Sequence, residues 1–288
     1  MRGNHGRWGE ADERGALNLL DAAAVRGAVG TVARGEAIDL SQPLSSTTPA
    51  PAGRGGLVHH MTRDGGDYAA GGRVLGRSRY AEDHIAMSTH LGTHIDALAH
   101  VWYEEELYNG HPQSAVRSGG AKRCGVDKLG PLVGRGVLLD LAATAAVDAL
   151  GAGDTVDAAS LERAAERAKV ELRPGDIVLL RTGWFAGAGE RYFEGEPGLD
   201  REGAAWLAAR DVAAVGADNY AVEALAGASN PQGFPVHELL LRDHGIPLIE
   251  NLDLERLAAI AAGPFLFVAL PLPLVGGTAS PLAPVAVV

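Results

Sequence analysis

The sequence contains very little cysteine and very little lysine. Cys124 is the only cysteine among 288 residues, which excludes an intrachain disulfide and a structural zinc site built on several thiolates. No motif surrounds Cys124, and we interpret it as an incidental thiol rather than a nucleophile. The only lysines are Lys122, Lys128 and Lys169; arginine carries the remaining positive charge. The cysteine count is typical of a protein in a reducing compartment.

Positive charge of any kind is scarce, and so are long apolar runs. A formal net charge of −11 opposes binding to a phosphate backbone, so we expect no nucleic-acid partner. The longest apolar run, residues 264–275, contains three prolines and is too short to span a bilayer. The first seven residues lack the apolar segment of a secretory signal. We therefore expect a cytoplasmic protein that binds no membrane.

Several common catalytic motifs are also missing. Neither Gly65-Gly66 nor Gly276-Gly277 is followed by the Gly-Lys-Ser/Thr of a phosphate loop. The chain has no Gly-x-Ser-x-Gly nucleophile elbow and no strand-linked Gly-x-Gly-x-x-Gly fingerprint. These absences argue against a nucleotide-dependent enzyme and against a serine hydrolase.

Glycine and proline are abundant but scattered. They total 54 residues, which indicates many turns between short elements rather than a linker. We expect one domain over residues 1–288, with an N-terminal arm over about residues 1–36. Residues 49–80 are predicted to form a mobile loop near the site. This loop contains His59 and His60, which we do not assign as metal ligands.

Hydrophobic patterning predicts an α/β architecture with a mixed sheet. Helices are predicted at residues 21–32, 157–170, 201–210, 236–242 and 253–262, with Asp157 as an N-cap. Strands are predicted at residues 37–40, 85–89, 136–141, 176–181, 212–217, 246–250 and 265–270.

Residues 88–100 contain the strongest chemical signal. His90, His94 and His100, three of the ten histidines, lie within eleven positions of one another together with Asp96. Such groups rarely gather for packing alone, because each buried polar group needs a partner. Two imidazoles and a carboxylate from His90, His94 and Asp96 form the ligand set of a catalytic Zn²⁺ site, and also suit Mn²⁺ or Fe²⁺. His100 remains free to act as a base beside the metal.

The local structure of this motif is also predictable. The His-x-x-x-His spacing could place both rings on one helix face, but Gly92, Thr93 and Ile95 are poor helix formers. We therefore expect the strand at residues 85–89 to run into a tight turn at Gly92. His94 and Asp96, two residues apart, would then point the same way.

The motif His90-Leu91-Gly92-Thr93-His94-Ile95-Asp96, followed by His100, resembles the signature of the metal-dependent cyclase family, which includes bacterial kynurenine formamidases and isatin hydrolases. Residues 39–44, 175–184, 236–240 and 245–252 are similar to further family segments, so that the resemblance runs from about residue 8 to residue 284. It implies a swivelling β/β/α fold, in which helices flank a barrel-like sheet.

The resemblance also implies site roles. His90, His94 and Asp96 would bind the metal, and His100 would be the catalytic base. His237 and Glu250 would complete the site, either through a second ion that shares Asp96 or as partners of the ligands. From the residues alone, His237 could instead be a packing residue at a helix start, and Glu250 a cap for the helix near Asp253.

Other candidate residues have two interpretations each. Ser280 could hydrogen-bond within the site or be a turn residue before Pro281. Trp102, Tyr103 and Tyr108 could line an aryl pocket, or could belong to the core or to an interface.

The expected function is hydrolysis of an amide or lactone in a small substrate by metal-activated water, with His100 as general base. Two departures, Leu98 in place of the formamidases' proline and Ala283 in place of their arginine, argue against a strict kynurenine formamidase. The alternatives are a non-catalytic metal- or ligand-binding protein on the same scaffold, and a cyclase or dehydratase of polyketide-type metabolism. The resemblance implies a homodimer or homotetramer.

Overall fold

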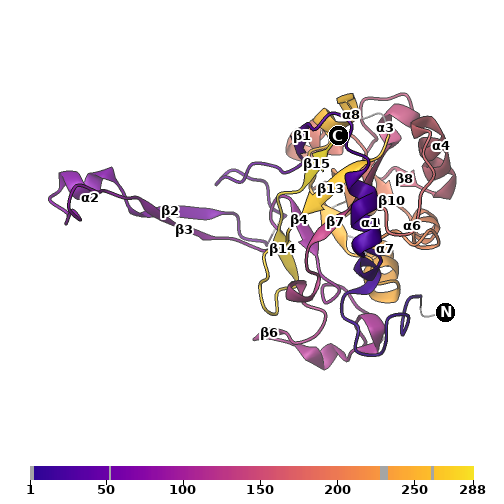
Figure 1. Cartoon of the computed structure of the whole chain (residues 1–288), viewed down its shortest axis with the longest axis horizontal. Helices are drawn as coiled ribbons and strands as arrows, with labels where there is room; N and C mark the ends of the chain where they lie inside the picture. The colour runs from indigo at the N-terminus through magenta and orange to yellow at the C-terminus, as the bar shows by residue number, and fades with distance from the viewer. Residues whose placement is uncertain (1–2, 52, 228–232, 261–262) are drawn as a thin grey trace.

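The computed structural model describes residues 3–51, 53–227, 233–260 and 263–288. A mixed sheet of nine strands organises this part of the chain (Figure 1). In spatial order its strands are β1 (Ala37–Asp39), β15 (Val285–Val287), β13 (Phe265–Ala269), β7 (Leu132–Asp140), β9 (Ile177–Arg181), β11 (Ala214–Ala217), β12 (Leu248–Glu250), β4 (His94–Asp96) and β14 (Ala279–Pro281).

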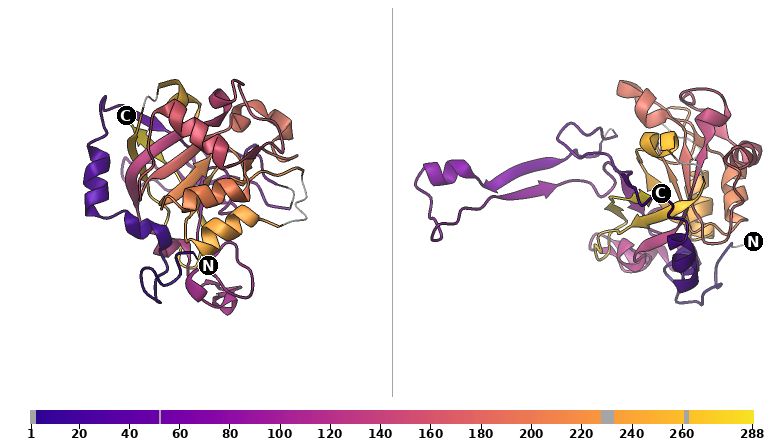
Figure 2. Two further views of the ribbon diagram at one scale, coloured as in Figure 1. Left: turned by 90° about the vertical axis from the view of Figure 1, so that its right-hand side faces the viewer. Right: turned by 45° about the horizontal axis from the view of Figure 1, so that its top comes forward.

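The centre of the sheet is parallel and its two flanks are antiparallel. Strands β7, β9, β11 and β12 run parallel, whereas β13, β15 and β1 on one side and β4 and β14 on the other pair antiparallel. Residues 177–180 of β9 are all buried and apolar, as expected for a strand covered on both faces. The sheet curls into a half barrel (Figure 2). The predicted α/β class with a mixed, barrel-like sheet is therefore confirmed.

Helices cover the sheet. Both α1 (Ala22–Val29) and α4 (Ala158–Ala168) contact β7, and α6 (Arg201–Ala208) contacts α4. Each of these three helices begins at an aspartate, Asp21, Asp157 or Asp200, whose side chain accepts a hydrogen bond from a backbone N–H of the first turn. The predicted cap at Asp157 is confirmed. Further α-helices are α3 (Leu141–Thr144), α5 (Trp184–Gly187), α7 (Pro235–His237) and α8 (Glu255–Ile260), and α2 is described below with the segment that contains it.

Short elements complete the chain. The two-stranded pairs are β5 (Val116–Arg117) with β6 (Gly120–Ala121), and β8 (Thr155–Val156) with β10 (Gly198–Leu199). The 3₁₀ turns are η1 (Gly15–Leu19), η2 (Tyr108–Gly110), η3 (Gln113–Ala115), η4 (Val126–Lys128) and η5 (Gly189–Arg191). None of the described helices is long and apolar enough to cross a membrane.

Two of the predicted elements need correction. The predicted helix at residues 236–242 begins as α7 but continues as a π-helix, η6 (Glu238–Asp243). The strand predicted at residues 85–89 is wrong, because the extended segment is β3 (Glu82–Ala86) and β4 starts only at His94. The turn expected at Gly92 is present, with φ of 62°. The helix predicted at residues 253–262 is α8, and residues 261–262 lie outside the described part.

The mobile loop predicted at residues 49–80 is largely an ordered hairpin. Strands β2 (Val58–Arg63) and β3 pair antiparallel, and α2 (Gly65–Ala69) lies at the tip. We call residues 53–87 the hairpin arm. It projects far from the sheet on the side of β14 (Figure 1). The prediction failed because the arm has no core to face, so its strands lack the apolar and polar alternation of a half-buried strand.

Candidate metal centre

The pairing of β4 brings together residues that are far apart in the sequence. Strand β4 lies between β12 and β14, and His94 is directly opposite Glu250 in the antiparallel register with β12. Opposite residues of such a pair present their side chains on the same face. His94 and Asp96, two residues apart on β4, share that face as predicted. Consequently, two of the motif residues and Glu250 converge at the end of the parallel strands.

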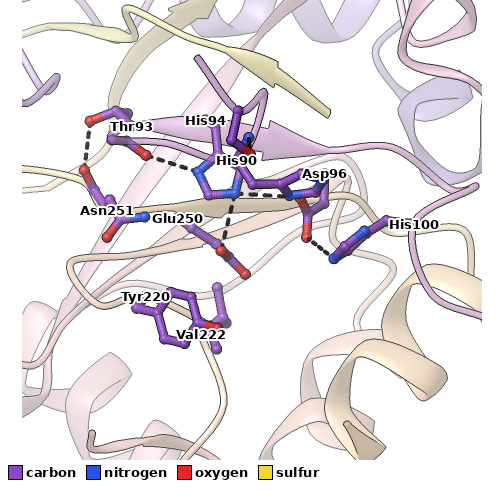
Figure 3. Close-up of polar contacts among 12 residues, drawn as sticks. His90, Thr93, His94, Asp96, His100, Tyr220, Val222, Glu250 and Asn251 are labelled. Atoms are coloured by element: carbon purple, nitrogen blue, oxygen red, sulfur yellow. Dashed lines mark hydrogen bonds and ion pairs between the residues drawn. The ribbon is translucent and has the colours of Figure 1, made fainter. Parts of the chain in front are cut away.

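His94 lies at the centre of the cluster (Figure 3). Its Nε2 is 3.2 Å from Glu250 Oε2 and 3.5 Å from Asp96 Oδ1. His237, from α7, has its Nε2 3.3 Å from Glu250 Oε1 and 3.8 Å from Asp96 Oδ2. All four side chains are buried. Glu250 and His237 therefore both face the cluster.

His90 and His100 also lie against Asp96, one at each carboxylate oxygen. His90 Nδ1 is 2.9 Å from Asp96 Oδ1, and His100 Nε2 is 3.6 Å from Asp96 Oδ2. The two imidazole rings are in contact, with centroids 4.2 Å apart and planes tilted by 38°. All six predicted site residues therefore lie in one cluster around Asp96.

Hydrogen bonds fix the orientation of two imidazoles. His94 Nδ1 donates to the carbonyl oxygen of Gly92 at 2.8 Å, and His237 Nδ1 donates to Glu223 Oε1 at 2.9 Å. Each bond leaves Nε2 facing the cluster, where the ring can offer a lone pair once Nε2 has lost its proton, which is the usual arrangement of metal-binding histidines. Glu223 was missed by the sequence reasoning, because it lies in a loop after β11 and belongs to no motif.

Buried polar atoms in the cluster lack hydrogen bonds. Among the described residues, the buried side-chain atoms without a partner of proper geometry are His90 Nδ1, His94 Nε2, both Asp96 carboxylate oxygens and Gln42 Nε2. Four of these five atoms belong to the cluster. Leaving such atoms unsatisfied is costly, so their convergence on one point indicates a ligand that all of them contact.

The charges of the cluster favour a cation. Burial lowers the pKa of His94, but Asp96 and Glu250 beside it raise that pKa to about 10. Burial also lowers the pKa of His237, and Glu223 and Glu250 raise it to about 10. Burial raises the pKa of Asp96, but His100 and His90 hold it well below its usual range. Protonated imidazoles thus place positive charge beside the two buried carboxylates. A divalent ion would supply this charge in place of the protons.

The donor set fits a divalent metal. Ligand atoms of His94, Asp96 and Glu250 lie within 4.8 Å of one another, and so do those of His90, Asp96 and His100. The two groups share Asp96, so the cluster can hold one ion or two. Imidazole and carboxylate donors suit Zn²⁺ and Mn²⁺.

His100 differs from the other imidazoles in charge and in access. Burial lowers its pKa to about 4, with His90 and His237 acting in the same direction against Asp96. It is therefore neutral near pH 7. Its side chain is 24% exposed, whereas those of His94 and His237 are 0% and 4% exposed. A neutral imidazole that reaches open space can accept a proton.

Two cavities flank the cluster. One, of about 210 Å³, is bordered by His90 and by the aromatic residues Phe185, Tyr192, Phe193 and Tyr220. The other, of about 260 Å³, is bordered by His100, His237, Glu250, Arg54 and again Tyr220. Tyr220 therefore borders both cavities, and each cavity also touches residues of the cluster.

Of the two interpretations of Trp102, Tyr103 and Tyr108, the aryl pocket is not the one found in the structure. Trp102 Nε1 donates to Gln113, Tyr103 donates to Asp243, and Tyr108 donates to Asp12. None of these three aromatic residues borders either cavity, and Tyr108 is fully buried in the core. The aromatic residues at positions 184, 185, 192 and 193 were the overlooked signal.

Two other candidates have structural roles. Ser280 lies in β14, where its Oγ accepts a hydrogen bond from Leu272 N at 2.8 Å and donates to Pro281 O at 2.7 Å. Cys124 is buried, and burial raises the pKa of its thiol far above the usual range. A protonated, buried thiol is not a nucleophile, in agreement with its interpretation as incidental.

Solved structures of similar fold span almost the whole chain. A structure described as a novel cyclase is 34% identical, has a TM-score of 0.93, and matches 99% of this chain and 97% of its own. Isatin hydrolase A from Labrenzia aggregata, bound to benzyl benzoate, is 24% identical with a TM-score of 0.67 over 94% of this chain and 98% of its own. A predicted metal-dependent hydrolase from Bacillus stearothermophilus is 23% identical with a TM-score of 0.58 over 87% and 97%.

The similarity to the isatin hydrolase and to the metal-dependent hydrolase, at 24% and 23% identity, shows a shared fold and no more. No curated protein matches the chain. The family model described as "Putative cyclase" matches residues 38–224, which include the whole His90–His100 motif. From this match and the 34% identical structure, the chain belongs to the cyclase family.

Proposed function

We propose that the protein is a metal-dependent hydrolase that opens a C–N or C–O bond of a small aryl or cyclic carbonyl compound, an amide or a lactone. The observation that carries this proposal is the buried cluster around Asp96, whose unpaired atoms lie beside a neutral His100 and between two cavities. A purely binding site has no need of a neutral, partly exposed imidazole next to its ligands.

His90, His94, Asp96, His237 and Glu250 would hold the metal, with Zn²⁺ preferred and Mn²⁺ the alternative. The ion would supply Lewis acidity, which makes a water acidic enough to be deprotonated near pH 7 and polarises a carbonyl group. Gly92 and Glu223 keep the rings of His94 and His237 in the tautomer that binding requires.

His100 would move the proton. Its neutral Nε2 accepts the proton of the attacking water as the new C–O bond forms. It returns the proton to the leaving nitrogen or oxygen as the old bond breaks, so that the ring ends the cycle neutral. Asp96 Oδ2, 3.6 Å from His100 Nε2, stabilises the protonated ring between these two steps.

The cavities support a small aromatic substrate. Four aromatic rings border the cavity next to His90, whose volume is about 210 Å³, and none of the described residues that border it is a lysine or an arginine. Isatin hydrolase A, which shares the fold, is named for a cyclic aryl amide. Ala283, where the formamidases have an arginine, removes one possible partner of a substrate carboxylate, worth about 1.5–3 kcal/mol as a charged hydrogen bond.

The role of His100 is tested by His100→Asn. We expect the variant to keep its metal and to lose about 10²–10⁴-fold in kcat, the usual contribution of a positioned acid–base group. His111→Asn is the matched control, because His111 is not among the lining residues of either cavity and its ring bonds to the backbone oxygen of Asp12. Near-normal kcat would show that His100 only packs, and loss of metal would make it a ligand.

The substrate class is tested by comparing kcat/KM for isatin, simple aryl lactones and N-formylkynurenine on the metal-loaded enzyme. We expect the cyclic compounds to be preferred, because the aromatic cavity offers no cation to an acyclic substrate's carboxylate. Preference for N-formylkynurenine by orders of magnitude would contradict our interpretation of Leu98 and Ala283.

A further inference from the structure

Arg54 is a cation without a counter-ion beside the metal centre. Arginines packed against the body of the fold have carboxylate partners: Arg135 with Asp176, Arg181 with Asp140 and Glu255, and Arg242 with Glu106 and Asp243. Arg54 is half-buried, yet it forms no ion pair with any of the described residues. Removing a charge from water is costly unless an opposite charge lies close to it. The position of Arg54 therefore suits an anion that the described residues do not provide.

Arg54 borders the cavity that contains the proposed base. That cavity, of about 260 Å³, is also bordered by His100 and Glu250. The guanidinium carbon of Arg54 lies 5.7 Å from the centre of the Tyr220 ring, a cation–π contact that keeps the side chain beside the cavity. Arg54 N donates to Pro51 O at 3.0 Å, so a turn fixes the backbone where the hairpin arm begins. The cation is therefore held at the wall of the cavity in which His100 lies.

The charge of Arg54 and the charges of the cluster act on the same hydroxyl group. Burial raises the pKa of Tyr220, Arg54 lowers it, and nearby carboxylates, among them Glu250, raise it. Glu250 has a histidine partner at each oxygen, His94 at Oε2 and His237 at Oε1. Arg54, in contrast, has the neutral ring of Tyr220. Of the two opposite charges that border this cavity, the positive one is not neutralised by a described residue.

Hydrolysis of an amide or a lactone creates the charge that this cation fits. Water gives its hydroxyl group to the carbonyl carbon and its remaining proton to the leaving nitrogen or oxygen. The carboxylic acid that forms then loses a proton to the solvent, because its pKa lies well below 7. A guanidinium binds such a carboxylate through two parallel N–H···O bonds. The neutral substrate lacks this group, so the contact is made with the product.

We propose that Arg54 binds the carboxylate that hydrolysis creates, so that the cavity next to His100 is a subsite for the anionic end of the product. The inference rests on the proposed function, because it assigns the second cavity of that site. The cavity next to His90, which has four aromatic rings and no described lysine or arginine at its border, takes the neutral ring. Arg54 consequently holds the product more tightly than the substrate.

Calorimetry with benzoate and acetophenone tests the proposal on the full chain loaded with Mn²⁺. The two ligands have nearly the same shape but differ in charge, and neither can be hydrolysed. We expect Arg54→Gln to weaken benzoate binding by about 10–100-fold, the usual effect of losing a charged hydrogen bond, and to change acetophenone binding by less than about twofold. Arg54→Lys keeps the charge and should lose less. Arg77→Gln is the matched control, because it removes the same charge at an exposed position between α2 and β3.

Three results of the binding experiment would overturn the proposal. They are a wild-type protein that does not bind benzoate, equal losses for benzoate and acetophenone in Arg54→Gln, and equal losses of benzoate binding in Arg54→Gln and Arg77→Gln. Circular dichroism and metal content confirm that each variant is folded and loaded. These readouts need no turnover, so a protein that shows the expected pattern but hydrolyses no amide or lactone would contradict the proposed function alone.

Kinetics on a neutral substrate distinguish binding of the product from binding of the substrate. We expect Arg54→Gln to weaken inhibition by the carboxylate product and to leave KM for the neutral substrate within about twofold. An increase in KM as large as the loss of product inhibition would mean that Arg54 contacts the substrate itself, which would also overturn the proposal.

Discussion

At the scale of the residue, Asp96 is the group on which the site depends. It is fully buried, and its two oxygens face His90 and His94 on one side and His100 and His237 on the other. A carboxylate without water is stable only if positive charge lies close to it. In the metal-free protein, protons on His94 and His237 supply that charge. A divalent ion has to displace them, which makes metal binding depend on pH.

We predict that the affinity for metal rises with pH. The pKa values of His94 and His237, about 10 in the folded metal-free protein, exceed the usual 6.5. Their contribution to metal-free stability is therefore fully present below pH 6.5 and is lost as pH rises through 10. The metal binds the neutral rings, so binding releases their protons. For each proton released, the affinity for metal rises by a factor of about ten per pH unit.

Titration calorimetry with Mn²⁺ at pH 6.5 and 7.5, in buffers of different ionisation enthalpy, measures both the affinity and the protons released. We expect one to two protons per ion. Binding that releases no proton and has the same affinity at both pH values would contradict the charge balance described for the cluster.

Local sequence was sufficient to predict the first part of the site. The spacing of His90, His94, Asp96 and His100 within one short segment predicted their convergence. His237 and Glu250 were expected only from the family resemblance. Glu223 and Tyr220 could not be predicted, because they reach the site through the packing of loops after β11 rather than through a pattern of neighbours.

At the scale of the element, the three-residue strand β4 positions the ligands, and Thr93 fixes where it begins. Thr93 Oγ1 accepts a hydrogen bond from Gln42 N at 2.8 Å and donates to Asn251 O at 2.6 Å. It thereby joins the segment after β1 to the end of β12. One buried hydroxyl holds three parts of the chain next to His94.

We predict that Thr93→Val lowers the free energy of unfolding by about 1–3 kcal/mol, because the nearly isosteric side chain leaves Gln42 N and Asn251 O without a partner. Urea denaturation of the metal-free protein measures the change. Thr155→Val, at an exposed position of β8, should change stability by less than about 0.5 kcal/mol. Equal effects of the two substitutions would mean that the Thr93 hydroxyl does not join these segments.

The hairpin arm is connected directly to the site. Pro49 and Pro51, just before the arm, border one cavity, and Arg54 at its base borders the other. Only residues 88 and 89 separate its other end from His90. Sequence patterning missed the arm because strands without a core show no periodicity. The position of its two ends beside the cavities was nevertheless consistent with the expected location near the site.

At the scale of the whole molecule, the order of the strands could not be predicted from local patterns. Apolar runs predicted β7, β9, β11, β12 and β13, because most residues of these strands are apolar. The pairing of β1 with β15 and the insertion of β4 between β12 and β14 join distant parts of the chain. Strands β14 and β15 were not predicted at all. Tertiary pairing, rather than propensity, defines them.

The central claim is that this sheet assembles a metal centre, and elemental analysis of purified wild-type protein and His94→Ala tests it most directly. We predict at least one bound divalent ion in the wild type and its loss from a folded His94→Ala, because the substitution removes the ring that contacts both Asp96 and Glu250. Full metal occupancy in the folded variant, or a wild-type protein that binds no divalent ion when Zn²⁺ or Mn²⁺ is supplied, would contradict the account.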